Sequence, residues 1–507
     1  MKISRKRAAL LLLGVGTLVA GSAAARAQDG CVRVLGYEWS GEKQSMDPAS
    51  MHSGDDAYHI FAVYNRLVDV DENFKVVPEL AESWSVSEDG KTWTFKLRDG
   101  VKFQSGKPFG AADVVYTFKR ILDPATGSGG SAPLGFLKDA TIEAKDPLTV
   151  VFSTPQPVAE LPLMITNKFT NIVPEGATTE SLRLKGDGTG PFMQEEFTPN
   201  APVRLLKANP NYWKAGKPAA PCLRITVAQE AVAATSALMA GEVDLALNVD
   251  PTAIAALKAN PSVQLMETGA SNSMTVSVWT DTKPFDDNRV RQAMKLAVDR
   301  QALVDSVLLG YGEVGNDNPV PLSSSNAYTT TAPARDVAKA KQLLAEAGYP
   351  NGLNIELYTA EGVPGMLKMG QSFAQMMADA GITVNVVETP ADTFWDSVWL
   401  KHPMVTSAWS MRPPTDGLSY PYVQTSNVNE THWMRPEYDA LLAKAAVTVD
   451  DQARTDLYKQ AQKMLAEEGG VIIPMFIHQV LALREGCSGY TPHVQNFNLN
   501  FEDLHCS

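Results

Sequence analysis

Two neighbouring stretches carry the residue types best suited to hold a small molecule. The first contains Phe394 and Trp399, and the second contains Trp409 and Arg412. Aromatic faces supply contact area in ligand pockets, while a few convergent polar groups set the orientation of the ligand. A guanidinium attracts carboxylates or phosphates and repels an amine. The pattern therefore predicts a binding site formed by Phe394, Trp399, Trp409 and Arg412, with Lys401 as a weaker basic candidate.

Each of these residues also has an ordinary structural interpretation. A Trp in such a stretch is often a core residue, and Arg412 can lie on the surface or pair with Asp416 one helical turn later. His432 beside Trp433 suggests a metal ligand, but a single His is more often a hydrogen-bonded structural residue. We therefore expect no metal site, nickel included.

Catalytic motifs are missing from the sequence. There is no G-x-S-x-G elbow, no H-E-x-x-H helix and no Cys–His arrangement. Asp55 and Asp56 could form an acid/base pair as in glycosidases, but adjacent acids in a polar loop are usually solvated. The Gly-rich run at 186–192 leads into an extended segment rather than a helix, which argues against a nucleotide loop. We expect no enzyme activity and no cofactor.

The N-terminus has the pattern of a cleaved export signal. A basic start precedes an apolar run at 8–20, and Ala25-Arg26-Ala27 is a small-x-small cleavage site, so residues 1–27 are expected to be removed. The signal region holds five basic residues and no acid, which changes the net charge from −13 to −13 − 5 = −18. This charge argues against nucleic acid or an anionic membrane surface as a partner. No later run is long enough to be inserted into a membrane.

Four cysteines in an exported chain suggest disulfides. Cys31 and Cys222 each precede a strand-like run, so their thiols would start at the same level if those strands were parallel neighbours. Cys487 and Cys506 lie close together near the C-terminus. Four cysteines allow three pairings, of which we favour 31–222 with 487–506.

Around these residues, strand and helix patterns alternate. Asp89-Gly90 between two alternating runs predicts a hairpin, and the apolar spacing of Val114, Phe118 and Ile121 predicts a helix from Gly110 to Asp123. A further helix pattern covers 57–68. Strand–helix–strand order recurs at 223–245 and 353–387, which favours a mixed α/β fold.

Several residue strings resemble one family. PELAESW, DGKTWTFKLRDGVKF and GKPFGAADVVYTF follow one another between residues 78 and 118, and GTGPF, NPNYW and GEVDL come later. Together they resemble the family 5 solute-binding proteins, the extracytoplasmic receptors of ABC importers for peptides, nickel and opines. The similarity extends over nearly the whole mature chain.

This resemblance implies a two-lobed periplasmic-binding-protein fold with mixed sheets, in the three-domain variant of family 5. Domain I would comprise 28–55, 188–268 and 480–507, domain II would be inserted as 56–187, and domain III would be 269–479. The chain would pass between the lobes near residues 268–280 and 475–485, and the lobes would close on the ligand by hinge motion.

The resemblance also implies roles for individual residues. Trp409 matches the Trp that lines the pocket of peptide-binding relatives, and Ser53 and Gly54 match a loop that contacts the ligand backbone. Those relatives have an Asp three residues after the Trp, which pairs with the peptide amino group, whereas this chain has Arg412. An anionic opine-like or phosphorylated conjugate is therefore the alternative to ordinary peptides.

The expected function is that of a monomeric periplasmic receptor that delivers peptides or a related small solute to an inner-membrane permease. ATP would be bound by the partner ATPase subunits. A periplasmic chaperone or signalling receptor on the same scaffold stays open, because a fold does not fix a function.

Overall fold

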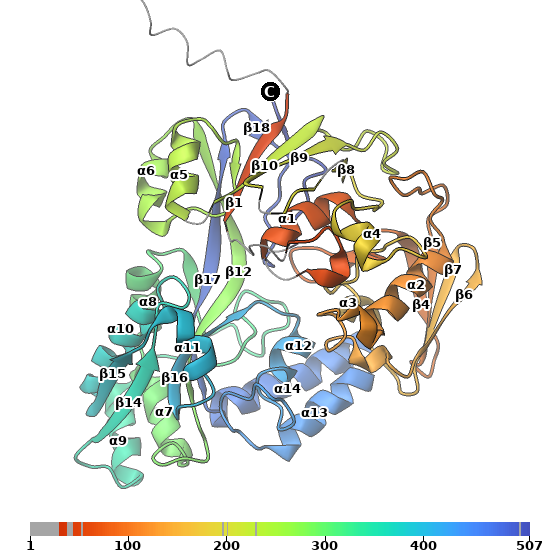
Figure 1. Ribbon diagram of the computed structural model, residues 1–507. Coiled ribbons are helices and arrows are strands. Elements are labelled where there is room, and N and C mark those ends of the chain that lie inside the picture. Colours follow the sequence, from red (N-terminus) through yellow and green to blue (C-terminus); the bar gives the residue numbers. More distant parts are fainter. Residues whose placement is uncertain are drawn as a thin grey trace, which may run out of the picture.

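An 11-stranded mixed sheet runs through the computed structural model, which describes residues 30–37, 44–51, 54–194, 197–199, 201–228, 231–495 and 498–507 (Figure 1). The predicted signal segment, 1–27, lies outside these residues. The strands follow the order β15-β14-β16-β12-β17-β11-β1-β10-β9-β8, and β13 pairs with β17. Their bounds are β1 (Val32–Tyr37), β8 (Phe192–Met193), β9 (Val203–Ala208), β10 (Cys222–Ala228), β11 (Leu245–Ala246), β12 (Val263–Val278), β13 (Gly312–Val314), β14 (Leu353–Thr359), β15 (Ile382–Glu388), β16 (Met404–Ser410) and β17 (Val471–Arg484).

Parallel and antiparallel pairs occur together in this sheet, so the predicted mixed α/β architecture is confirmed. β1 lies parallel to β10 and β11, and β14 lies parallel to β15 and β16, whereas β12 and β17 run antiparallel. Parallel neighbours need a crossover connection, and the helix between β14 and β15 supplies one, whereas the helix after β10 leads to β11 on the far side of β1.

The remaining strands form smaller sheets. β4 (Ala81–Val86), β5 (Thr92–Leu97), β6 (Thr141–Asp146) and β7 (Thr149–Ser153) form a sheet in the order β4-β5-β7-β6, while β2 (Val68–Val70) pairs with β3 (Val76–Pro78) and β18 (Cys487–Ser488) pairs with β19 (His505–Cys506). The predicted hairpin joins β4 to β5, and Gly90 in its turn has a φ of 69°. Glycine adopts this left-handed conformation without steric cost because it has no Cβ.

Fourteen α-helices cover the sheets within the described residues. They are α1 (Gly54–Val63), α2 (Ala111–Leu122), α3 (Leu161–Met164), α4 (Thr179–Arg183), α5 (Ala231–Met239), α6 (Ile254–Lys258), α7 (Asn288–Ala297), α8 (Arg300–Val307), α9 (Val337–Glu346), α10 (Met366–Asp379), α11 (Ala391–Ser397), α12 (Pro414–Ser419), α13 (Pro436–Val447) and α14 (Asp451–Glu468). Short 3₁₀ turns occur at Pro48–Ser50, Pro124–Thr126, Gly135–Leu137 and Pro251–Ala253.

Two lobes lie on either side of the β12–β17 pair (Figure 1). We call the part with β1 to β11 and α1 to α6 the first lobe, and the part with β13 to β16 and α7 to α14 the second lobe. β12 pairs with β16 of the second lobe, and β17 pairs with β11 of the first. Between Glu267 and Asn272 the β12–β17 register shifts twice. The crossings predicted near 268–280 and 475–485 fall on these two strands, and the irregular register marks the place where they can bend.

The helix predicted over 57–68 is wrong at its end. α1 stops at Val63, and Val68 already begins β2. Gly188 and Gly190 pack directly against the Val63 backbone, where an added Cβ would lie within 2.7 Å of its carbonyl oxygen. Tertiary packing therefore ends the helix at a point that its apolar pattern does not reveal. Asp56 is also fully buried rather than solvated in a loop.

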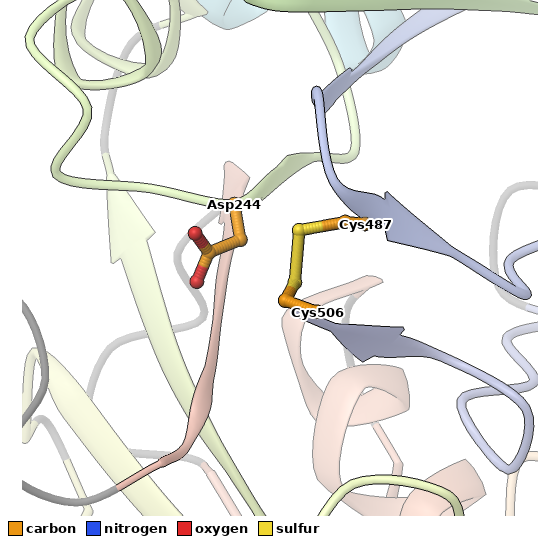
Figure 2. A group of neighbouring side chains, drawn as sticks. All are labelled: Asp244, Cys487 and Cys506. Atoms are coloured by element: carbon orange, nitrogen blue, oxygen red, sulfur yellow. A yellow bond between two sulfur atoms is a disulfide. The ribbon is translucent and has the colours of Figure 1, made fainter.

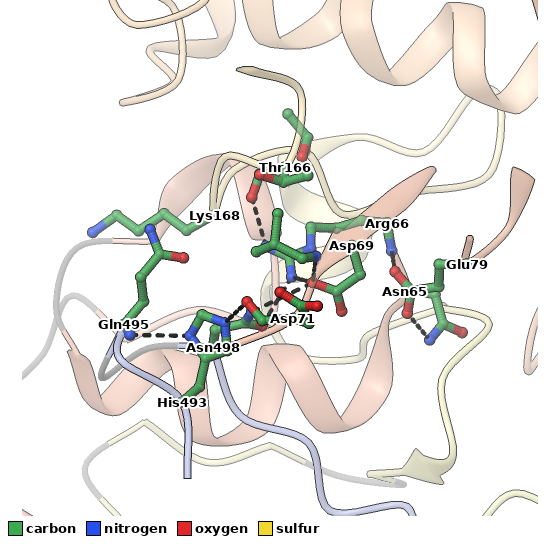
Figure 3. A network of polar contacts seen from close by, with 12 residues as sticks. Asn65, Arg66, Asp69, Asp71, Glu79, Thr166, Lys168, His493, Gln495 and Asn498 are labelled. Carbon is green, nitrogen blue, oxygen red and sulfur yellow. Dashed lines mark hydrogen bonds and ion pairs between the residues drawn. The ribbon is translucent and has the colours of Figure 1, made fainter. Parts of the chain in front are cut away.

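The C-terminal segment is tied to the first lobe through Arg66, which is 1% exposed (Figure 3). Arg66 donates hydrogen bonds from Nη1 to the Thr166 carbonyl at 2.6 Å and from Nη2 to Asn498 Oδ1 at 2.8 Å, and it also pairs with Asp69. His493 Nε2 lies 2.9 Å from the Asp71 carbonyl oxygen. Because a buried charge is costly without partners, this network fixes the chain end on the hairpin formed by β2 and β3.

The disulfides join Cys31 to Cys222 and Cys487 to Cys506, which is the pairing that the sequence favours. Val32 and Leu223 are register partners on the parallel strands β1 and β10, so the two preceding thiols do start at the same level. The second disulfide joins β18 to β19.

Candidate functional site

Four aromatic side chains form a continuous row on the second lobe. Trp395 on α11, Trp399 just after it, Trp409 on β16 and Tyr420 after α12 contact one another edge to face, with centroid separations of 5.8, 5.9 and 5.8 Å. We call these four residues the aromatic row. Trp395 and Tyr420 at its ends are exposed, and the two middle rings are half-buried. Rigid aromatic faces of this kind offer a large contact area to a ligand.

Glu430 orients the two middle rings. Its side chain is 1% exposed, and its carboxylate accepts hydrogen bonds from the indole Nε1 of Trp399 at 3.0 Å and of Trp409 at 3.1 Å. The hydroxyl of Ser277 on β12 donates a third hydrogen bond at 2.7 Å. Burial and the nearby Glu430 carboxylate raise the pKa of Tyr422 well above its ordinary value, so that its hydroxyl stays neutral. By accepting both hydrogen bonds, the Glu430 carboxylate fixes the orientation of the two indole rings.

Arg412 lies over the same row. Its guanidinium carbon is 4.9 Å from the centroid of Tyr420 and 5.9 Å from that of Trp409, and Nη1 pairs with Asp416 at 2.6 Å. This is the i,i+4 pair that the sequence left open as the structural alternative. Nε of Arg412 is buried and has no hydrogen-bond partner among the described residues. The positive charge is therefore already balanced, while one donor stays available.

A small pocket of about 10 Å³ opens beside the row, lined by residues of β12 and the second lobe. Ser273, Trp409, Arg412 and Tyr422 contribute to its lining. Phe74, from the hairpin of the first lobe, packs against the apolar cluster that contains Tyr422. Thr415 on α12 bonds to Glu160 of the first lobe. The candidate site thus lies at the boundary between the lobes.

The remaining predicted site residues do not join the row. Phe394 is fully buried in a core cluster, with its ring centroid 5.1 Å from that of Trp395, and its contact with a ligand stays a prediction. Lys401 is exposed in the turn between α11 and β16. Gly54 is the first residue of α1, and Ser53 lies outside the described residues.

Metal ligation has little support in the described residues. His432 stacks on Trp279 at 4.2 Å and lies 3.1 Å from an Asp281 carboxylate oxygen, as expected of a structural histidine. Among the residues that the structure describes, the one cluster with suitable ligand atoms comprises Asp244, Cys487 and Cys506 (Figure 2). Its cysteines form a disulfide, so they offer no thiolate.

Asp244 in that cluster has a structural role. Burial alone would raise the pKa of Asp244. Hydrogen bonds from Arg33 and Arg484 outweigh burial and hold this pKa below its usual range. Arg33 Nη2 and Arg484 Nε lie 2.6 and 2.7 Å from Oδ1, which joins β1 to β17.

Sequence reasoning missed Glu430 and Tyr420. A single acid in a polar loop ordinarily looks solvated, so no signal singled out Glu430. Tyr420 follows Arg412 by eight positions, and its aromatic character was a signal that could have extended the predicted row.

Comparisons with known proteins identify the family. The family described as "Bacterial extracellular solute-binding proteins, family 5 Middle" matches residues 75–430. The chain belongs to family 5 of the bacterial extracellular solute-binding proteins. Among its relatives, the di/tripeptide-binding protein 1 of Pseudomonas aeruginosa is 32% identical over 84% of this chain and 86% of its own length.

The chain is also similar to proteins that are named for other ligands. The heme-binding protein A of Haemophilus influenzae is 31% identical over 79% of both chains. The solved structure of HbpA2 from Haemophilus parasuis matches with a TM-score of 0.82 and 26% identity, covering 94% of this chain and 99% of that one. The predicted two-lobed family 5 fold is thereby confirmed, and the relatives found are binding proteins rather than enzymes.

Family 5 proteins are periplasmic or extracellular, and they deliver solutes to ABC permease and ATPase components. In the described part of the chain no helix is both long and apolar enough to cross a bilayer.

Proposed function

We propose that this chain is a periplasmic receptor that binds a di- or tripeptide between its lobes and delivers it to an inner-membrane ABC permease. It acts as a monomer after removal of residues 1–27. The observation that carries the proposal is the aromatic row, held in place by Glu430 at the boundary of the two lobes. The named activity of the relative from P. aeruginosa, over 84% of this chain, agrees with it.

The chemistry of the site suits a peptide. A short peptide presents apolar side chains for the faces of Trp409 and Tyr420, and amide carbonyls for donors. The buried Nε of Arg412 needs an acceptor, and a peptide carbonyl supplies one without adding charge. Ser53 and Gly54 remain candidates for backbone contacts, and Trp399 for the site wall.

The anionic alternative is weaker. Its argument was the positive charge of Arg412, but Asp416 already pairs with that charge at 2.6 Å. A carboxylate or phosphate ligand would have to displace Asp416 or bring two negative groups together. Lys401 is exposed in a turn and offers no fixed replacement.

Hinge closure is the motion we propose for binding. Domain I (28–55, 188–268 and 480–507) and the inserted domain II (56–187) would move together against domain III (269–479). The irregular pairing of β12 and β17 near Glu267 to Asn272 supplies two thin connections that can bend.

A thermal-shift screen of the chain from Gln28 tests the ligand class. The panel holds di- to hexapeptides, opine-like and phosphorylated conjugates, and nickel chelates. A ligand at 100 times its Kd stabilises the folded state by about 2.7 kcal/mol. We expect di- and tripeptides to give that shift, and Arg412→Ala, which removes the Nε donor, to weaken the Kd about tenfold without abolishing binding. A shift with anionic conjugates alone, abolished by Arg412→Ala, would overturn the peptide proposal.

A further inference from the structure

Away from β12 and β17, one carboxylate joins the two lobes. Glu160 lies just before α3 in the first lobe, and its Oε2 accepts a hydrogen bond from the Tyr458 hydroxyl of α14 at 2.6 Å. Thr415 on α12 donates to the same oxygen. Arg454 Nε lies 3.3 Å from Oε1. All three partners belong to the second lobe, and α3 faces α12 and α14 in Figure 1.

Arg454 is held in position by further contacts within the second lobe. Arg454 also donates from Nη1 to the carbonyls of Thr448 and Val449 at 3.0 and 3.1 Å. The side chains of Arg454 and Glu160 are only 12% and 14% exposed. Because water is largely excluded, these charge-assisted hydrogen bonds are stronger than those of an exposed pair.

The rest of this boundary is loosely packed. A cavity of about 410 Å³ adjoins Glu160, with Phe136 and Pro157 on the first-lobe side and Ala446 on the second-lobe side. One backbone hydrogen bond crosses nearby, from Ala159 N–H to the Ala446 carbonyl at 2.9 Å. Apolar packing of Phe74 against the cluster around Tyr422 also crosses the boundary, and the contacts of Glu160 supply the polar part of the attachment.

We infer that Glu160 is a closure latch, which joins the lobes opposite the β12–β17 connection and sets how fast the bound solute escapes. The inference rests on the proposed function for both the solute and the hinge motion, and the solute-free distance measurement tests the motion without any solute. A hinge at Glu267 to Asn272 lets the lobes separate, and breaking the Glu160 contacts is the step that frees them.

Glu160→Gln tests the latch by removing its charge. Spin labels at Lys145→Cys on β6 and Lys463→Cys on α14 report the distance between lobes, because all four native cysteines are in disulfides. We expect the ratio of closed to open conformers in the solute-free protein to fall about tenfold, the scale of one charge-assisted hydrogen bond. Dissociation of a bound dipeptide should accelerate by a similar factor, with association changed less than about threefold.

Glu180→Gln, on exposed α4 of the same lobe, is the matched control and should behave as the wild type. Tyr458→Phe removes a single latch hydroxyl while keeping its ring, and should shift the ratio in the same direction by about threefold. Distance distributions of Glu160→Gln and Tyr458→Phe that match the control would overturn the latch. If no peptide binds, the proposed function fails, while the solute-free distances still decide the latch.

Discussion

The carboxyl group of Glu79 is buried within the network of Figure 3. Asn65 Nδ2 and the Arg66 backbone N–H donate to its two oxygens at 2.6 and 2.9 Å. Burial, with a smaller contribution from Asp69, raises the pKa of Glu79 to about 7 against the opposing charges of Arg66 and Lys214. The folded protein therefore holds a proton on Glu79 at a pH where the unfolded chain has lost it.

This protonation difference predicts a pH-dependent stability. Between pH about 4.3, the ordinary pKa of Glu, and pH 7, only the folded state keeps the proton, so the free energy of unfolding falls as pH rises, by about 4 kcal/mol in total. Above pH 7 the contribution is flat. Glu79→Gln should flatten the decline in denaturant unfolding between pH 5 and 7, whereas exposed Glu82→Gln should leave it unchanged. Equal slopes for Glu79→Gln and the wild type would contradict this account.

The candidate site was predictable from the sequence only in part. Trp399, Trp409 and Arg412 were found because aromatic and basic residues are uncommon enough to be noticed as a group. Glu430 was not found, because its role depends on the fold, which buries its side chain to 1% exposure beside two indole rings. The ion pair of Arg412 with Asp416 was one of two open interpretations, and spacing alone could not choose between them.

At the scale of elements, the disulfides give a contrast in loop length. Cys31–Cys222 closes a separation of 191 residues and Cys487–Cys506 one of 19 residues. In the chain-entropy description, the larger loop restricts the unfolded chain more, by about 2 kcal/mol.

Replacing both members of each pair with serine tests this contrast. Loss of Cys31–Cys222 should lower the free energy of unfolding by about 2–5 kcal/mol, and loss of Cys487–Cys506 by less. Chemical denaturation of both variants under oxidising conditions gives the comparison. A larger cost for Cys487–Cys506 would show that local packing at β18 and β19, rather than loop closure, determines the stabilisation.

Local chemistry made several elements predictable. Gly110 and Asp123 flank α2 as expected, and the Asp89-Gly90 turn joins β4 to β5. The extent of β12 was not predictable, because its half near Val263 alternates weakly and is held by pairing with β17, which is distant in sequence. Non-local pairing of this kind leaves no periodic signal in a short window.

For the molecule as a whole, the account depends on two lobes that meet through a thin hinge and a polar latch. The aromatic row lies on one lobe at their boundary, so a solute placed against it would be covered when the lobes close. Enclosure between lobes gives one site per chain, and a solute held there contacts both lobes at once.

Isothermal titration calorimetry of the mature chain with di- and tripeptides is the most direct test. We expect saturable binding of one peptide per chain, and a loss of affinity of at least about tenfold in Trp409→Ala, since that ring lies at the centre of the row. Trp84→Ala, on β4 of the small sheet, serves as the control and should bind as the wild type does. Absence of binding by every peptide, or equal affinity of Trp409→Ala and the wild type, would contradict the proposal that the aromatic row forms a peptide site.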